Sequence, residues 1–313
     1  MNMMDVRENI PLAPLTTFKI GGPARYFVDV HNEEEIRAAL AWARERGMRF
    51  VVLAGKSNIL VPDEGLNALV ISIAEGTFSL AGTELAADAG CNLLSLIRAA
   101  GEKSLGGWEK LAGIPGTIGG AVRGNAGAFG PEIKDFVTKI RALDAETGEM
   151  REFENIACDF SYRHSFFKDN SKWIITRVYI ELTRVEPSLS AREAENTITE
   201  RERRHIQNVQ AAGSYFMNPV APEEVRTMFE KEKGVTSREG RVPAGWLIEK
   251  AGMKGARVGG AVASEQHPNY LKNDGNATAL QVQELAQKVK DAVQAKFGIE
   301  LQEEAAIIRG DQC

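Results

Sequence analysis

The chain has 313 residues, 43% of them hydrophobic and 26% charged, which is the composition of an ordinary globular protein rather than a disordered one. A single core seldom grows beyond about 250–300 residues, so this length predicts two or three domains. With 38 basic and 43 acidic residues the net charge is −5, which argues against nucleic acid or an anionic membrane as the main partner.

The N-terminus, the cysteines and the histidines indicate a metal-free protein of the cytoplasm. No apolar run reaches the roughly 18–20 residues of a membrane span. The first ten residues lack the basic-then-apolar order of a signal peptide. Cys91, Cys158 and Cys313 are odd in number and far apart, so no disulfide framework is expected. The four histidines show no metal-ligand spacing with these cysteines.

The first third of the chain predicts two small α/β regions. A strand is expected over 24–30, followed by a helix that Asn32 caps and that ends at Gly47. A buried strand over 50–53 completes a β-α-β unit. A second α/β region begins at Leu69, and its expected elements are strands near 69–73 and 84–88 and a helix near 92–100.

Beyond residue 130 strands are followed by helices. The strands are expected over 137–144, 150–154 and 172–183. The polar stretch 184–190, which contains a proline, is the expected domain boundary. After it the periodicity predicts helices over about 191–206, 222–233, 244–252 and 278–296.

The most unusual feature of the chain is a glycine-rich segment. Nine of the 30 glycines lie between Gly106 and Gly130. A flexible linker would be polar and rich in serine, whereas apolar side chains such as Ile118 and Val122 interrupt this segment. Because glycine lets backbone N–H groups approach an anion directly, the segment is expected to be ordered and buried and to hold phosphate.

Two common phosphate-binding motifs do not account for this segment. No two glycines are separated by one residue, which excludes the G-x-G-x-x-G fingerprint. Residues 55–57, Gly-Lys-Ser, resemble the end of a P-loop, but Phe50 stands where that motif needs its first glycine, and residues 58–62 predict a strand or turn instead of a helix. The loop 54–58 and the glycine-rich segment are together suited to an extended dinucleotide.

Five short motifs follow one another along the chain: T-T-F-K-I-G-G (16–22), the segment 113–130, S-Y-R-H-S (161–165), G-S-Y-F-M-N-P (213–219) and L-Q-E-E-A-A-I-I (301–308). Together they resemble the UDP-N-acetylenolpyruvoylglucosamine reductases (UDP-N-acetylmuramate dehydrogenases), flavoenzymes of peptidoglycan synthesis. The likeness covers nearly the whole chain. The stretch between Thr183 and Gly213 has no room for the extra loop of the longer subclass, so the chain resembles the shorter type II subclass.

This resemblance implies an α+β fold with a two-subdomain FAD-binding module of the vanillyl-alcohol-oxidase (PCMH) type and a C-terminal α/β substrate-binding domain. The module is expected over 1–184, with subdomains of about 1–66 and 67–184, and the substrate-binding domain over 185–313. The family uses NADPH to reduce FAD and then reduces an enolpyruvyl sugar nucleotide. A monomer without a nucleic-acid or membrane partner is expected.

The resemblance also places FAD against the two small-residue loops. The residues implied to bind it are Gly55, Lys56, Ser57, Asn58, Ile59, Pro115, Gly116, Thr117, Gly119, Gly120, Asn125, Ala126 and Gly127. An alternative is a flavin oxidase or dehydrogenase that acts on another alcohol or sugar. Many such oxidases tether FAD through a histidine or cysteine in the first loop, and residues 54–58 contain neither, which argues against this alternative.

The family motifs imply three catalytic residues. Arg163 is the cation that stabilises the enolate formed when hydride adds to C3 of the substrate. Ser214 is the proton donor to C2, a step that needs close positioning because a serine hydroxyl is a weak acid. Glu304 stabilises the enol(ate) by hydrogen bonding or lies close to the path of proton transfer, and the adjacent Glu303 is a competing candidate.

Two further residues are implied to contact the substrate. Asn218 resembles a substrate-contacting asparagine. Arg204 stands where relatives carry a basic residue before Gln-Pro, here replaced by His205-Ile206, which makes Arg204 a candidate for the UDP phosphates. A second alternative is a nucleotide-binding protein without activity, and the presence of all three catalytic residues in their motifs argues against it.

Overall fold

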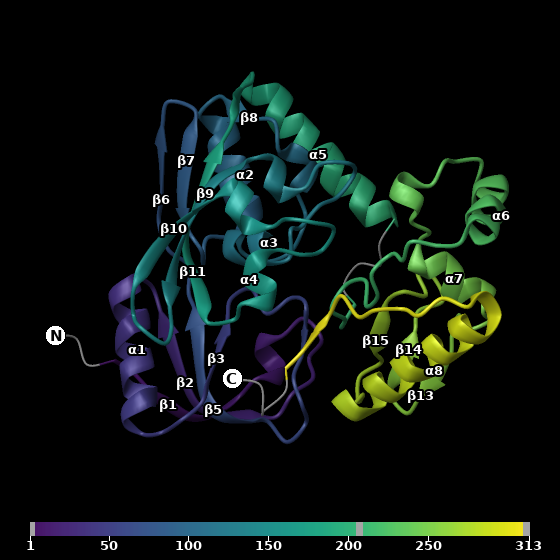
Figure 1. Cartoon of the computed structure of the whole chain (residues 1–313), viewed down its shortest axis with the longest axis horizontal. Helices are drawn as coiled ribbons and strands as arrows, with labels where there is room; N and C mark the ends of the chain where they lie inside the picture. The colour runs from purple at the N-terminus through teal and green to yellow at the C-terminus, as the bar shows by residue number, and fades with distance from the viewer. Residues whose placement is uncertain (1–3, 205–208, 309–313) are drawn as a thin grey trace.

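The structure is a computed structural model that describes residues 4–204 and 209–308. Figure 1 shows two bodies, a larger one formed by the first two thirds of the chain and a smaller one formed by the residues after α5. Helices and strands are mixed in both, as the expected α+β class requires. Among the described helices, none combines the length and apolarity needed to pass through a bilayer.

The first sheet of the larger body has the strand order β1-β2-β5-β3, in which β2, β5 and β3 are parallel and β1 is antiparallel to β2. Helix α1 packs on it and begins where predicted, because the Asn32 side chain accepts a hydrogen bond from the Glu35 N–H. The elements are β1 (Arg7–Pro11), β2 (Pro23–Val30), α1 (Glu33–Glu45), β3 (Phe50–Leu53) and β5 (Leu66–Ile73).

Strand β5 corrects the predicted subdomain boundary. A division at 66/67 assigns this strand to the second subdomain, but it pairs with β2 on one side and β3 on the other. Its near-continuous burial is that of a central parallel strand that is covered on both faces. The boundary was wrong because pairing between distant strands leaves no local signal, and the first sheet extends to Ile73.

The second sheet is antiparallel throughout and has the order β10-β9-β11-β7-β6. Helices α2, α3 and α4 share its core, which includes the fully buried Trp108. The elements of this region are β6 (Phe78–Ala81), β7 (Glu84–Asp88), α2 (Leu93–Glu102), β8 (Leu105–Gly106), α3 (Ile118–Arg123), β9 (Val137–Asp144), β10 (Met150–Glu154), α4 (Phe166–Asp169), β11 (Trp173–Glu181) and β12 (Thr183–Arg184).

Helix α3 lies inside the glycine-rich segment, where the sequence predicted order but no helix. Ile118 and Val122 are fully buried, which confirms that the segment is not a linker. A Cβ at Gly119 would lie 2.7 Å from the Ala89 side chain, so glycine allows the helix to pack closely there. Packing forms this helix despite two glycines of low helix propensity.

Helix α5 (Pro187–Arg204) corrects the predicted domain boundary at 184/185. Its Ala194 and Ile198 pack into the core of the second sheet, and the Ser190 hydroxyl donates to Glu109 at 2.6 Å. The helix therefore belongs to the larger body, although its polar composition suggested the start of a new domain. The change of body comes after Arg204 (Figure 1).

Within the described residues, the smaller body contains the α-helices α6, α7 and α8 and a small antiparallel sheet. Helix α8 lies close to the predicted range 278–296; the Thr278 hydroxyl caps its start by accepting from the Gln281 N–H, and the helix ends at Gly298 in a left-handed conformation. Its buried face includes Val282 and Val289. The elements are α6 (Glu223–Lys233), α7 (Ala244–Lys250), β13 (Arg257–Val258), β14 (Ala261–Ala263), β15 (Leu271–Asn273) and α8 (Ala279–Phe297).

The C-terminal segment returns to the larger body, where β16 (Ala306–Ile307) pairs in parallel with β4 (Ile59–Leu60). Figure 1 shows this segment in yellow, crossing from α8 towards the first sheet. In the opposite direction, Phe18 and Ile20 of the 16–22 motif are buried in the core of the smaller body. The two bodies are thus joined by reciprocal contacts, and the candidate site lies where they meet.

Candidate active site

The centre of the site is an ion pair between Arg163 and Glu304. The Arg163 Nε lies 2.7 Å from the Glu304 Oε1, and both side chains are about one-fifth exposed. Arg163 is in a tight turn closed by a bridge between Ser161 and His164. Its backbone is left-handed (φ 57°), and its Nη2 donates to the Gly127 carbonyl at 3.1 Å. The glycine-rich segment therefore helps to orient the predicted catalytic arginine.

Glu304 rather than Glu303 occupies the site. Glu303 points to Lys290 instead, at 3.1 Å. The Glu304 backbone is held by two contacts: its N–H donates to the Tyr215 carbonyl at 2.8 Å, and its carbonyl accepts from Asn58 Nδ2 at 3.1 Å. One glutamate is thus tied both to the first predicted FAD loop and to the serine motif.

Burial raises the pKa of the Glu304 carboxyl, and the charges of Arg163 and Lys168 oppose that rise. The pKa of Lys168 is itself lowered, first by burial and then by the nearby Arg123. The Lys168 ammonium donates to the Arg163 carbonyl at 2.9 Å. A carboxyl with a raised pKa among cations is able to bind or release a proton during a reaction.

Ser214 is linked to this pair through the backbone of the residue that follows it. The next residue, Tyr215, donates from its N–H to Asn269 and accepts from Glu304, so Ser214 is held between two strand-like segments. The serine is half-buried, and within the described residues its hydroxyl has no protein partner. A hydroxyl in this position is available to a bound substrate.

The two predicted FAD loops touch each other. A Cβ at Gly55 would lie 2.7 Å from the Gly116 Cα, and the Ser57 hydroxyl donates to the Pro115 carbonyl at 3.2 Å. Lys56 has a left-handed backbone (φ 52°), and its ammonium donates to the Ala54 carbonyl and the Ser72 hydroxyl. The Lys56 side chain thus stabilises the loop through hydrogen bonds to the protein.

The backbone N–H groups of these loops fit an anionic group. In the described part of the chain, no protein acceptor is found for the N–H groups of Lys56, Ser57, Asn58, Gly116 and Thr117. Uncompensated amides beside side-chain-free positions are suited to phosphate oxygens. The residues present therefore fit the diphosphate of a dinucleotide.

Comparisons with known proteins agree with this geometry. Residues 204–308 match the family model "UDP-N-acetylenolpyruvoylglucosamine reductase, C-terminal domain", and residues 24–154 match "FAD binding domain". The reductase of that name from Solibacter usitatus is 36% identical over 303 residues, which cover 97% of this chain and 96% of the relative. The chain belongs to the UDP-N-acetylenolpyruvoylglucosamine reductase family.

Further relatives give the same result. The Pseudomonas aeruginosa reductase is 34% identical and covers 96% of this chain, with 98% of its own length matched. The crystal structure of UDP-N-acetylenolpyruvylglucosamine reductase from Thermus caldophilus aligns with a TM-score of 0.77 at 30% identity, over 98% of this chain and 100% of that one. The predicted two-subdomain FAD module with a C-terminal domain is confirmed, and the chain is an FAD-dependent oxidoreductase.

In this reductase, several of the residues predicted to bind FAD also make hydrogen bonds within the protein. The buried Asn125 donates to the Glu132 carboxylate and to the Ser161 carbonyl, which ties the glycine-rich segment to the Arg163 turn. The N–H of Gly119 donates to Ala89, and both backbone polar groups of Ala126 are paired. These hydrogen bonds account for Asn125, Gly119 and Ala126 without any bound ligand, so a contact of these three residues with FAD stays a prediction. The same holds for Ile59, Gly120 and Gly127.

The predicted substrate residues are placed in part. Asn218 accepts at Oδ1 from the Ala244 N–H at 3.0 Å, and its own N–H donates to the Tyr162 hydroxyl at 3.3 Å. The side chain of Arg204 and the replaced Gln-Pro site at 205–206 lie outside the described residues. The contacts of Arg204 and Asn218 with substrate therefore stay predictions.

Sequence reasoning missed three residues of the reductase site. The ring of Tyr162 contacts Arg163 and Arg241, whose guanidinium carbons are 5.1 and 4.1 Å from its centre. Arg201 is close enough to Tyr270 and Arg163 for their charges to influence its pKa, which burial lowers. Tyr162 could have been identified from the sequence because it is next to the predicted Arg163, whereas no sequence motif marks Arg201 or Arg241. No group of three or more metal-ligating side chains occurs within residues 4–204 and 209–308.

The contact between the two loops can be tested with Gly55→Ala. The added methyl would meet the Gly116 backbone at 2.7 Å, and overpacking of this kind costs about 1–3 kcal/mol. We expect the Kd for FAD to rise by about tenfold or more, measured by titrating the apoprotein. Gly124→Ala is the matched control, because its methyl would meet nothing closer than 3.7 Å. Equal affinity in both variants would contradict a cradle formed by the two loops.

Proposed function

We propose that this chain reduces UDP-N-acetylglucosamine enolpyruvate to UDP-N-acetylmuramate with NADPH and FAD, in the synthesis of peptidoglycan precursors. The observation that carries this proposal is the meeting of an arginine, a carboxyl and a serine beside a dinucleotide cradle. Arg163 and Glu304 are 2.7 Å apart, and the Glu304 N–H donates to the residue next to Ser214. Family membership supplies the substrate class.

Each of the three side chains has a role that its position supports. Arg163 holds the substrate carboxylate and stabilises the negative charge that develops on it after hydride addition. Glu304 in its protonated form donates a hydrogen bond to the same enolate, for which its raised pKa suits it. The Ser214 hydroxyl gives its proton to C2, and it has no protein partner among the described residues that would hold it away from a substrate.

FAD fits the cradle of Gly55–Asn58 and Gly116–Thr117, whose backbone N–H groups would hold its diphosphate. When bound, FAD supplies the transfer of hydride from NADPH to the enolpyruvyl C3. The protein orients the enolpyruvyl group against that cofactor and fixes its carboxylate. For the UDP phosphates we propose Arg204, and Asn218 as a further substrate contact.

The proposed function is tested by the spectrum and kinetics of the purified protein. We expect a yellow preparation whose flavin absorbance is bleached by NADPH alone, and steady NADPH consumption only when the enolpyruvyl sugar nucleotide is added. Rapid reoxidation by air without that substrate would instead favour a flavin oxidase. A folded protein that takes up no FAD on reconstitution would end the proposal.

We further propose that the enzyme works in the cytoplasm as a monomer. UDP-sugar substrates and NADPH are soluble small molecules, and the reciprocal contacts between the two bodies complete the site within one chain. Sedimentation velocity of the FAD-loaded enzyme measures the oligomeric state directly.

A further inference from the structure

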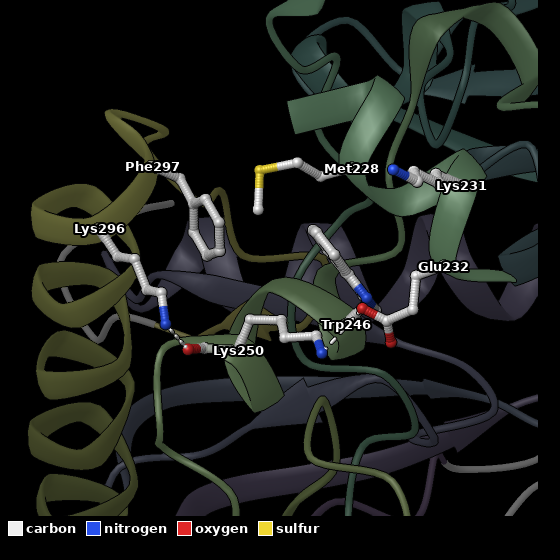
Figure 2. A pocket seen from close by; sticks show the side chains of 7 residues that line it. All are labelled: Met228, Lys231, Glu232, Trp246, Lys250, Lys296 and Phe297. Atoms are coloured by element: carbon white, nitrogen blue, oxygen red, sulfur yellow. Dashed lines mark hydrogen bonds and ion pairs between the residues drawn. The ribbon is translucent and has the colours of Figure 1, made fainter. Parts of the chain in front are cut away.

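A groove between α6, α7 and α8 in the smaller body (Figure 2) is largely covered by the chain's own side chains. Its Trp246 is only 5% exposed. The ammonium nitrogens of Lys250 and Lys296 lie 5.9 and 5.8 Å from the ring centres of Trp246 and Phe297. The groove therefore offers little open ring surface to a ligand. The polar groups that bear on the proposed catalytic residues lie in the larger body instead.

One such group is the carboxylate of Glu132, which follows the glycine-rich segment. Its side chain is 15% exposed. One of its oxygens accepts from Asn125 Nδ2 at 3.0 Å and lies 2.9 Å from the Lys134 ammonium. The hydrogen bond to Glu132 is the main cause that raises the pKa of Lys134. Glu132 is thus a charged acceptor that two partners hold in place.

The first route from Glu132 to Arg163 runs through Asn125, which is fully buried. The Asn125 Nδ2 donates both to Glu132 and, at 2.8 Å, to the Ser161 carbonyl, while its Oδ1 accepts from a backbone N–H at 3.3 Å. The same Ser161 carbonyl accepts from the His164 N–H at 3.1 Å, which closes the turn that contains Arg163. Because both hydrogens of the amide are used, its orientation depends on the Glu132 acceptor. Glu132 therefore fixes how Asn125 holds the turn.

The second route runs through Gly127. Gly127 and Glu132 form an antiparallel bridge, and a Cβ at Gly127 would lie 2.7 Å from the Glu132 Cγ. The Glu132 side chain thus packs directly on the Gly127 backbone. The Gly127 carbonyl accepts from Arg163 Nη2 at 3.1 Å, and the Arg163 Nε lies 2.7 Å from Glu304. The two routes therefore reach the backbone and the guanidinium of the same arginine.

We propose that Glu132 is a positioning residue for Arg163: through Asn125 and Gly127 it sets where the guanidinium stands relative to Glu304 and to the substrate carboxylate. The backbone of Arg163 is left-handed (φ 57°), a conformation that a residue with a side chain keeps only where surrounding contacts impose it. The inference rests on the proposed function, because it assigns Glu132 to the half-reaction in which Arg163 acts.

The kinetic test compares Glu132→Ala with Glu132→Gln by stopped-flow absorbance of the FAD-loaded enzyme. Glu132→Ala removes the acceptor of Asn125 and the contact with Gly127, so reoxidation by the enolpyruvyl substrate should fall by about 10–100-fold. Reduction by NADPH should stay at the wild-type rate. Glu132→Gln keeps an oxygen for Asn125 and should restore most of the loss. The control Glu152→Ala removes a glutamate that is paired with Lys139 at the same 2.9 Å and should change neither rate.

Two further measurements separate positioning from a merely structural role. In the Arg163→Met background, Glu132→Ala should cause almost no further loss, because the guanidinium that it positions is gone. The Nε–H resonance of Arg163 in the NMR spectrum is identified by its absence in Arg163→Met. Its exchange with water should be about tenfold faster in Glu132→Ala than in the wild type or Glu132→Gln, since the bond to Glu304 opens more often.

The positioning role would be overturned by wild-type rates in Glu132→Ala, by equal slowing of both half-reactions, or by a loss that adds in full to that of Arg163→Met. A Glu132→Gln variant as slow as the alanine variant, or an unchanged exchange rate, would also overturn it. If Glu132→Ala retains no FAD, Glu132→Asp takes its place, because it keeps the charge and withdraws the carboxylate from Asn125 by one methylene. A wild-type enzyme whose reduced flavin the enolpyruvyl substrate does not reoxidise would contradict the proposed function instead, and the exchange rate would still decide whether Glu132 positions Arg163.

Discussion

Replacing Ser214 by alanine is expected to separate the two half-reactions of the enzyme. Flavin reduction by NADPH should proceed at the wild-type rate, because the hydroxyl takes no part in it. Reoxidation by the enolpyruvyl substrate should fall by about 10²-fold or more, the usual loss when a positioned proton donor is removed. Stopped-flow absorbance of the flavin band measures both rates in one instrument.

The structure offers a matched control for this prediction. Ser171 is exposed and lies far along the chain from the serine motif, so Ser171→Ala should change neither rate. The Ser214 variant should fold normally, since the hydroxyl has no protein partner in the described residues and the backbone bonds of Tyr215 remain. If both half-reactions slow to the same extent in Ser214→Ala, Ser214 is not the proton donor.

Arg163→Met should give a second large loss, confined to the same half-reaction. The side chain keeps much of its length but not the charge that stabilises the developing enolate. Removal of one such group from an active site costs about 10²–10³ in rate, or about 2.7–4 kcal/mol. Single-turnover reoxidation measures the loss. Arg98→Met is the control, because that arginine is exposed and its nearest carboxylate, on Glu195, is 3.9 Å away.

The pH profile distinguishes a catalytic role for Arg163 from a merely structural one. The positive charge of Arg163 lowers the pKa of Glu304, in opposition to burial. The protonated form of Glu304 is the proposed donor, so its contribution is present below that pKa and is lost as the pH rises through it. Without Arg163 the pKa rises further, and the basic limb of the residual activity should move to higher pH. An unmoved limb would contradict the coupling of this pair in catalysis.

Elements with local signals were predicted well. Asn32 and Gly47 lie at the two ends of α1 as predicted, because capping depends on residues next to the helix, and α8 (Ala279–Phe297) lies within one residue of the predicted 278–296. The central place of β5 and the docking of α5 were missed, since both depend on partners far away in the sequence.

The residues of the site also divide into those marked by a local sequence motif and those placed by distant contacts. Motif resemblance selected Arg163 and Glu304, and the structure brings them together. The competing candidate, Glu303, points to Lys290 instead, because the register of the C-terminal segment alternates the two neighbouring side chains. Arg201 and Arg241 reach the site only through the packing of α5 and of the smaller body, so no local pattern marked them.

The return of residues 301–308 to pair with β4 has a consequence for biosynthesis. Domains emerging from the ribosome fold from the N-terminus onward, so the cradle of Gly55 and Gly116 is complete long before Glu304 has been translated. The proposed site therefore lacks one of its three catalytic side chains until the C-terminal segment has left the ribosome and has paired with β4.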